Sequence, residues 1–164
     1  MPIVGNLVSA ILTVIPFFVI FVYYKNFDTV IFVHASFLFL IVSIRELTKD
    51  LENIKGDLTL NYRTIPIVYG EKISKQMISA LVALTLIPAY LLVTKYQVGK
   101  MNFYFLLCEI LLIAYLVLLW KSNTKTHYLW LHNILKFILI AGVFSIVLID
   151  YDLVLNRLTF LFSV

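Results

Sequence analysis

The sequence predicts an all-α membrane protein with about five transmembrane helices. Of its 164 residues, 62% are hydrophobic and 13% are charged, whereas soluble domains have about 45–50% apolar and about 25% charged residues. The mean hydropathy is +1.00, and a chain of this size has too little interior to bury such an excess. This composition excludes a soluble globular domain and a disordered chain. A single cysteine, Cys108, excludes an internal disulfide scaffold.

Five apolar stretches are long enough, or nearly so, to cross a bilayer as helices, which takes about 20 residues. They cover residues 7–24, 29–44, 76–94, 101–120 and 134–149. The second stretch is short, but the helical pattern that follows can lengthen it. A sixth apolar stretch, 158–164, is too short to span. We therefore expect one transmembrane domain over residues 1–164, with a polar loop at 45–75.

The distribution of Lys and Arg predicts the orientation. Of the 13 basic residues, nine fall on the side of the 45–75 loop and four on the other side, so the positive-inside rule places that loop in the cytoplasm. The sequence thus predicts an integral protein of the cell (inner) membrane. Because the basic residues are spread between apolar runs, they are typical of topology signals, and no nucleic-acid partner is expected.

The cytoplasmic loop also concentrates the acidic residues, because five of the nine lie between positions 46 and 71. Residues 45–57 contain no proline and follow a span directly, so we expect the helix to continue past the membrane surface. At about 100° per residue, one stripe about 60° wide would hold Glu46, Asp50, Asn53 and Asp57. Three carboxylates and an amide oxygen would then share one helix face.

Two interpretations of this acidic stripe are open. Ion pairs Glu46–Lys49 and Glu52–Lys55, at i,i+3, would make it a solvated helix end. However, Glu46 and Asp50 are like charges at i,i+4, which repel, so a cation that bridges them would be stabilising. Oxygen ligands of this kind suit Mg²⁺, which usually binds one or two carboxylates and keeps waters or phosphates at its other positions.

The basic residues around the acidic stripe indicate that an anion could bind beside the metal. The cations that could hold this anion are Arg45, Lys49, Lys55 and Arg63. At a membrane surface the combination suggests a site for a phosphorylated lipid. Gly56 is expected to loosen or end the helix, and residues 58–70 are expected to form a loop over the mouth of a cavity. Residues 63–66 should be extended, because Pro66 disfavours helix at the residue before it.

At these positions the sequence resembles the second aspartate-rich motif of the UbiA superfamily of intramembrane prenyltransferases. The matching residues are Arg45-Glu46-x-x-Lys49-Asp50-x-x-Asn53-x-x-Gly56-Asp57, then Arg63-Thr64-x-Pro66 and Gly70. Gly5-Asn6, before an apolar helix, also resembles the start of the fifth helix of the family. Asn53 is a departure, because many members have Asp there; an amide oxygen can still ligate a metal, with less charge.

The resemblance implies a fold of about nine helices in two halves, each with one acidic motif beside a central cavity. The two motifs would hold Mg²⁺ and the diphosphate of a polyprenyl donor, whose allylic cation is captured by a hydrophobic acceptor. The implied catalytic residues are Asp50 and Asp57. The implied metal ligands are Glu46, Asp50, Asn53 and Asp57, and the implied substrate-binding residues are Arg45, Lys49, Arg63 and Thr64.

Only one of the two acidic motifs is present, because Asp28 is the sole acid in residues 1–45. The five spans correspond to the fifth to ninth helices of the family. We therefore expect the chain to resemble the C-terminal half of such an enzyme, to pair with an N-terminal half and to be inactive alone. The sequences of residues 45–57 and 63–66 are most similar to the branch of the family that alkylates geranylgeranylglyceryl phosphate. Aromatic acceptors are an open alternative.

Two other classes of function compete with the enzyme: a non-catalytic membrane scaffold or assembly subunit, and a small transporter. A transporter needs polar residues along several spans, and only Glu109 and a few hydroxyls are available. An ionisable residue within a span is by default a functional candidate, yet Glu109 can equally be a carboxyl paired with a hydroxyl on a neighbouring helix. His127 and His132 fall in the expected loop 121–133, where they could reach phosphate or simply belong to a basic interfacial loop.

Overall fold

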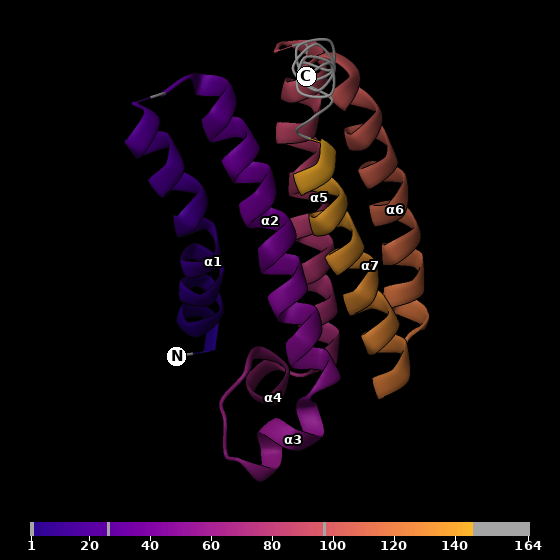
Figure 1. The fold of residues 1–164 in the computed structure, drawn as a ribbon. Helices are drawn as coiled ribbons and strands as arrows, with labels where there is room; N and C mark the ends of the chain where they lie inside the picture. Colours follow the sequence, from indigo (N-terminus) through magenta and orange to yellow (C-terminus); the bar gives the residue numbers. More distant parts are fainter. Residues whose placement is uncertain (1, 26, 97, 146–164) are drawn as a thin grey trace, which may run out of the picture.

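A computed structural model describes residues 2–25, 27–96 and 98–145, and within these ranges it is entirely helical (Figure 1). Seven α-helices and one short 3₁₀ turn follow one another. They are α1 (Pro2–Tyr24), α2 (Thr29–Glu52), α3 (Ile54–Thr59), α4 (Ile65–Tyr69), α5 (Glu71–Thr94), the 3₁₀ turn (Gly99–Met101), α6 (Asn102–Lys121) and α7 (Lys125–Ser145). The all-α prediction is confirmed.

Four of the described helical segments are long and apolar enough to cross a membrane: Thr29–Glu52, Glu71–Thr94, Gly99–Lys121 and Lys125–Ser145. The predicted span 7–24 lies in α1, where Pro2–Pro16 forms a shorter apolar segment. The last span begins at Lys125 rather than at 134, which reduces the predicted loop 121–133 to residues 122–124. Residues 146–149 of that span and the apolar stretch 158–164 lie outside the described residues.

Helix α2 is the centre of the bundle, because it packs against α1, α5 and α7, while α6 packs against α5 and α7. The α2 residues Ile41, Ile44 and Leu47 are almost completely buried in this core. Helix α6 shows the complementary pattern, with Leu106, Ile110 and further residues at helical spacing exposed on its outer face. Such an apolar face suits contact with lipid. In a membrane the helices associate through close packing of their inner faces.

Helix α2 ends at Glu52, so the prediction of one continuous helix as far as Gly56 is wrong. Asn53 leaves the helical conformation, with φ −103° and ψ 11°, and its N–H donates to the Lys49 carbonyl at 3.1 Å. Helix α3 begins directly after it and contains Gly56. Asn is common at helix ends, although the Asn53 side chain makes no capping hydrogen bond to α3. The break therefore falls three residues before the glycine.

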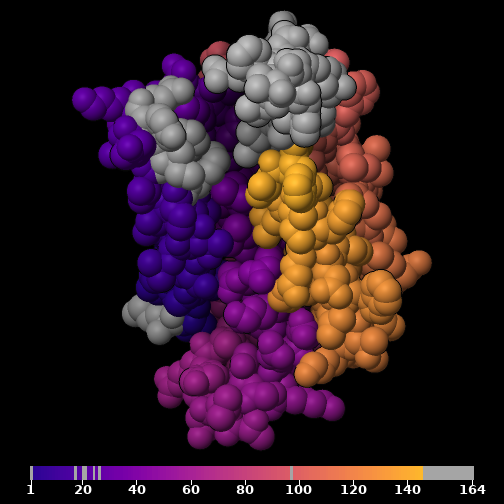
Figure 2. Space-filling view, viewed as in Figure 1, coloured from indigo at the N-terminus to yellow at the C-terminus, as the bar shows by residue number. Residues whose placement is uncertain are grey.

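The predicted loop 58–70 is also partly helical. Helix α3 continues to Thr59, and α4 starts at Ile65 with Pro66 in its first turn. Proline suits this place because the N–H it lacks has no partner in the first turn of a helix. Residues 65 and 66, which were expected to be extended, are therefore helical, while Thr64 before them is extended (φ −81°, ψ 165°). Gly70, at φ +86°, turns the chain from α4 into α5. The α3–α4 segment projects as a cap from one end of the bundle (Figure 2).

Candidate active site

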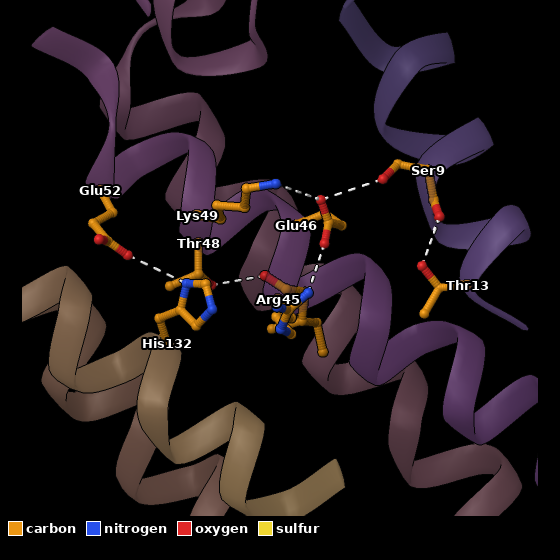
Figure 3. Close-up of polar contacts among 9 residues, drawn as sticks. Ser9, Thr13, Arg45, Glu46, Thr48, Lys49, Glu52 and His132 are labelled. Carbon is orange, nitrogen blue, oxygen red and sulfur yellow. Dashed lines mark hydrogen bonds and ion pairs between the residues drawn. The ribbon is translucent and has the colours of Figure 1, made fainter. Parts of the chain in front are cut away.

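Two charged turns of α2, from Arg45 to Glu52, follow the apolar part of the helix that ends at Ile44. Glu46 is the most buried acid there, with 8% of its surface exposed. One of its oxygens lies 2.8 Å from the Arg45 guanidinium; the other lies 3.5 Å from Lys49 Nζ and accepts a 3.3 Å hydrogen bond from Ser9 of α1 (Figure 3). The predicted Glu46–Lys49 pair is therefore present. Glu46 thus pairs with two of the predicted substrate-binding residues, Arg45 and Lys49.

Asp50 lies one turn further along α2 and is half-buried. Burial, followed by the negative charges of Asp57 and Glu46, raises the pKa of Asp50 to about 6, although a hydrogen bond from the Asn6 side chain of α1 opposes the shift. The three carboxylates are thus close enough to repel one another. A bound cation would relieve this repulsion.

The four predicted metal ligands belong to three structural segments. Glu46 and Asp50 lie on α2, Asn53 at the break, and Asp57 on α3, with Asn53 and Asp57 both half-buried. Within the described ranges, no three His, Cys, Asp or Glu side chains are grouped closely enough to hold a metal by themselves. The fold therefore supplies neighbouring carboxylates rather than a closed protein cage.

Two predicted substrate-binding residues precede α4. Arg63 is exposed, and Thr64 is half-buried in the extended residue before the helix. The Thr64 hydroxyl oxygen is buried and has no hydrogen-bond partner in the part of the chain that the structure describes. Buried hydroxyls usually have a partner, so the hydrogen-bonding capacity of this oxygen is unused in the described structure.

The opposite side of α2 faces α6 and α7 and carries a separate set of contacts. Thr48 and Tyr115 of α6 form a buried 2.6 Å hydrogen bond, and Glu52 lies 3.2 Å from His132 Nδ1 (Figure 3). The interpretation of His132 as a loop residue is wrong, because it lies on α7 and only 7% of its surface is exposed. The predicted Glu52–Lys55 ion pair is also absent among the described residues, because the break at Asn53 separates the two side chains.

A buried lysine joins three helices near the same end of the bundle. Lys75 of α5 has 5% of its surface exposed. Its Nζ donates to the Ser122 carbonyl at 2.6 Å and lies 2.9 Å from the Glu71 carboxylate. Tyr128 of α7 donates its hydroxyl to Glu71 and also contacts the Ser122 carbonyl. This Lys75 cluster fixes the α6–α7 turn against the start of α5.

Sequence reasoning missed the contacts that α1 makes with α2. Their signal is visible in hindsight, because Asn6 and Ser9 are polar residues at i,i+3 in a largely apolar helix. For Lys75 the sequence shows Glu71 at i−4, but not the Ser122 carbonyl, which is distant along the chain. Glu109 lies within α6, and its Oε1 is buried without a hydrogen-bond partner among the described residues, so pairing with a neighbouring hydroxyl stays a prediction.

Comparisons with known proteins agree with the motif. Residues 1–133 match the UbiA prenyltransferase family. The chain is 31% identical over 159 residues to digeranylgeranylglyceryl phosphate synthase of Methanobrevibacter smithii, a match covering 88% of this chain and 54% of that protein. It is 41% identical over 54 residues to the enzyme of the same name from Methanopyrus kandleri, covering 30% of this chain and 20% of that one. No solved structure matches the chain significantly.

The chain is a membrane-helix protein of the UbiA prenyltransferase family. It spans about half the length of the first of these relatives. The region that matches the family, residues 1–133, contains the charged turns of α2, the α3–α4 cap and helices α1, α5 and α6.

Proposed function

We propose that the chain takes part in the Mg²⁺-dependent transfer of a prenyl group from a polyprenyl diphosphate to a hydrophobic acceptor. The main supporting observation is that the half-buried carboxylate of Asp50, at the cytoplasmic end of α2, is repelled by the carboxylates of Asp57 and Glu46. Membership of the UbiA family supports the reaction class. In this proposal the α3–α4 cap faces the cytoplasm and the helices lie in the cell membrane.

The donor set fits Mg²⁺ that is shared with a diphosphate. Mg²⁺ usually binds through one or two carboxylates and takes its remaining ligands from water or phosphate. Asp50 and Asp57 would supply the carboxylates, with Asn53 as a further oxygen ligand. The buried Thr64 hydroxyl, which has no partner in the described structure, supports a phosphate nearby. When bound, Mg²⁺ would neutralise the diphosphate as the allylic C–O bond breaks.

The remaining residues of the site would orient the donor. Two cations would bind phosphate oxygens. They are Arg63, which is exposed within the α3–α4 cap, and Lys49, which precedes Asp50 in the sequence. Glu46 pairs with Arg45 and Lys49, so their cationic ends would lie near the site before the donor arrives. Such prior positioning lowers the cost of binding and of charge separation.

Among acceptors we favour a geranylgeranylglyceryl phosphate type. Both named relatives are digeranylgeranylglyceryl phosphate synthases, and residues 45–57 resemble that branch. An aromatic acceptor is the alternative within the same reaction class, and competition between the two types of acceptor in a transfer assay distinguishes them.

Donor binding tests the proposal on the chain as it is. Radiolabelled geranylgeranyl diphosphate is added to the protein in lipid nanodiscs, with Mg²⁺ or with EDTA. We expect binding that requires Mg²⁺ and is lost in Asp50→Ala and Asp57→Ala. Asp28→Ala, which removes an acid from the other end of α2, should bind as the wild type does. Equal binding with EDTA, or by the two site variants, would contradict the proposal.

Prenyl transfer itself requires a second experiment. We expect no turnover by the 164-residue chain alone, and transfer when it is co-expressed with an N-terminal half that carries the first acidic motif. Asp50→Ala and Asp57→Ala should then abolish transfer without affecting membrane insertion. Unchanged transfer in both variants would instead favour a scaffold that supports a site located elsewhere.

A further inference from the structure

The α3–α4 cap exposes large apolar side chains outside the long apolar helices. Leu58, Leu60 and Tyr62 have 56%, 64% and 59% of their surfaces exposed. They occupy alternate positions at and just after the end of α3, which has only six residues. Exposed apolar side chains that gather on one short segment mark a contact surface. The turn after α3 is therefore a candidate for contact with another surface.

A helix-ending motif gives this turn a fixed backbone. Asn61 adopts the left-handed conformation, with φ 55°. The Tyr62 N–H donates to the Asp57 carbonyl at 2.9 Å. The Asn61 N–H donates to the Leu58 carbonyl at 3.3 Å. These two bonds form the Schellman motif, in which Asn sometimes takes the left-handed position. The exposed apolar residues are thus presented by an ordered turn.

The charges exposed around the turn are all basic. Lys55, Arg63 and Lys72 are exposed, and none of them takes part in an ion pair among the described residues. The acids among them in the sequence, Asp57 and Glu71, are only half-buried or paired. Anionic lipid headgroups attract such cations, whereas lysine is depleted from the centres of protein interfaces. The charge pattern therefore favours a lipid surface over a protein partner.

The cap also lies near the level at which α1 enters the bilayer. Helix α4 packs against α1, α2 and α5, and α1 begins at the end of the bundle that carries the cap (Figure 1). Helix α1 exposes apolar side chains from Ile3 onward, as a lipid-facing helix does. The bilayer must therefore reach nearly to the start of α1, which brings the headgroups of that leaflet close to α4 and to the turn before it.

We propose that the turn after α3 anchors the cap in the membrane interface. The side chains of Leu58, Leu60 and Tyr62 insert at the boundary between headgroups and acyl chains, where apolar side chains and Tyr are favoured. Lys55 and Lys72 contact anionic headgroups. This inference does not rest on the proposed function, because a membrane anchor requires neither a donor nor a metal.

Quenching of a bimane label tests the inference on the whole chain in nanodiscs. Leu60→Cys is labelled with bimane, while buried Cys108 stays unlabelled. Quenching by brominated acyl chains is then compared with quenching by iodide in the water. Ile110→Cys, at an exposed position in the middle of α6, is the reference for lipid. Thr59→Cys is the matched control, because Thr59 is an exposed polar neighbour whose hydroxyl bonds back to carbonyls of α3.

We expect brominated lipids to quench the Leu60 label as they quench the Ile110 label, and to quench the Thr59 label much less. Quenching at Leu60 should increase when the phosphatidylcholine of the nanodiscs is mixed with phosphatidylglycerol, and Lys55→Gln with Lys72→Gln should remove this increase. Quenching of the Leu60 label by iodide alone would overturn the inference, because the turn would then lie in water. Protection from both quenchers would also overturn it, because a protein surface would then cover the turn.

Discussion

Lys75 offers the sharpest test of how the bundle is held together at the end that carries the α3–α4 cap. Lys75→Met keeps the apolar stem but removes the ammonium that contacts Ser122, Asn123 and Glu71 at 2.6, 3.4 and 2.9 Å. Breaking a buried ion pair costs about 3–5 kcal/mol. The Glu71 side chain is 41% exposed, so water can replace the lysine on that side, and we expect a loss of about 2–3 kcal/mol.

The assay is the free energy of unfolding in mixed micelles of dodecyl maltoside and SDS, followed by circular dichroism. Lys72→Met is the matched control, because Lys72 is exposed on the same helix and should change stability by at most about 0.5 kcal/mol. Tyr128→Phe, which removes the hydroxyl from the same partners, should couple with Lys75→Met in a double-mutant cycle. If Lys75→Met is as stable as Lys72→Met, the Lys75 cluster does not hold the α6–α7 turn.

Three other predictions concern the site, the core and the topology. Because the pKa of Asp50 is about 6 in the folded chain and its ordinary value is 3.8, the folded state binds more protons between these values, so stability falls as pH rises from 4 to 6. Asp50→Asn should therefore stabilise the metal-free protein by about 2 kcal/mol at pH 7.5, allowing for solvent screening, and not at all at pH 3; an equal gain at both pH values would be inconsistent with this pKa. A Cβ on Gly142 would lie 2.6 Å from the Tyr104 hydroxyl oxygen, so Gly142→Ala should cost about 1–3 kcal/mol of unfolding free energy. Tyr104→Phe should relieve much of that cost, and additive effects would refute the clash. Finally, Thr59→Cys, at an exposed position of α3, should react with an impermeant maleimide only from the cytoplasmic side, while buried Cys108 stays unlabelled; labelling of Thr59→Cys from outside would reverse the topology.

The helices themselves could be predicted from the sequence because apolar runs of sufficient length have few alternatives in a membrane. The motif residues on α2 were predictable for the same reason, since helical spacing places Glu46 and Asp50 on one face. The break at Asn53 was not, because both Asn53 and Gly56 favour a helix end and only the tertiary setting selects between them. Helix α4 was missed because Pro66 was interpreted from its effect on the preceding residue alone.

Long-range polar contacts explain why the burial of Lys75 and the position of His132 could not be predicted from the sequence. Lys75 was counted among the basic residues of the loop 45–75, yet it is buried because Glu71 and the Ser122 carbonyl surround its charge. His132 was assigned to a loop, yet it lies on α7 beside Glu52. Glu71 is a neighbour of Lys75 at i,i+4 on α5, but the Ser122 carbonyl and the Glu52 carboxylate lie far from Lys75 and His132 in the sequence, and no periodicity within one segment predicts such contacts.

The central claim is that Asp50 and Asp57 bind a divalent cation together with a diphosphate. The most direct measurement is the anomalous difference density of a crystal grown with Mn²⁺ and farnesyl diphosphate. We predict one peak between the diphosphate and the carboxylates of Asp50 and Asp57, and its loss in Asp50→Ala. A manganese peak elsewhere, with the two carboxylates turned away from the diphosphate, would contradict the claim.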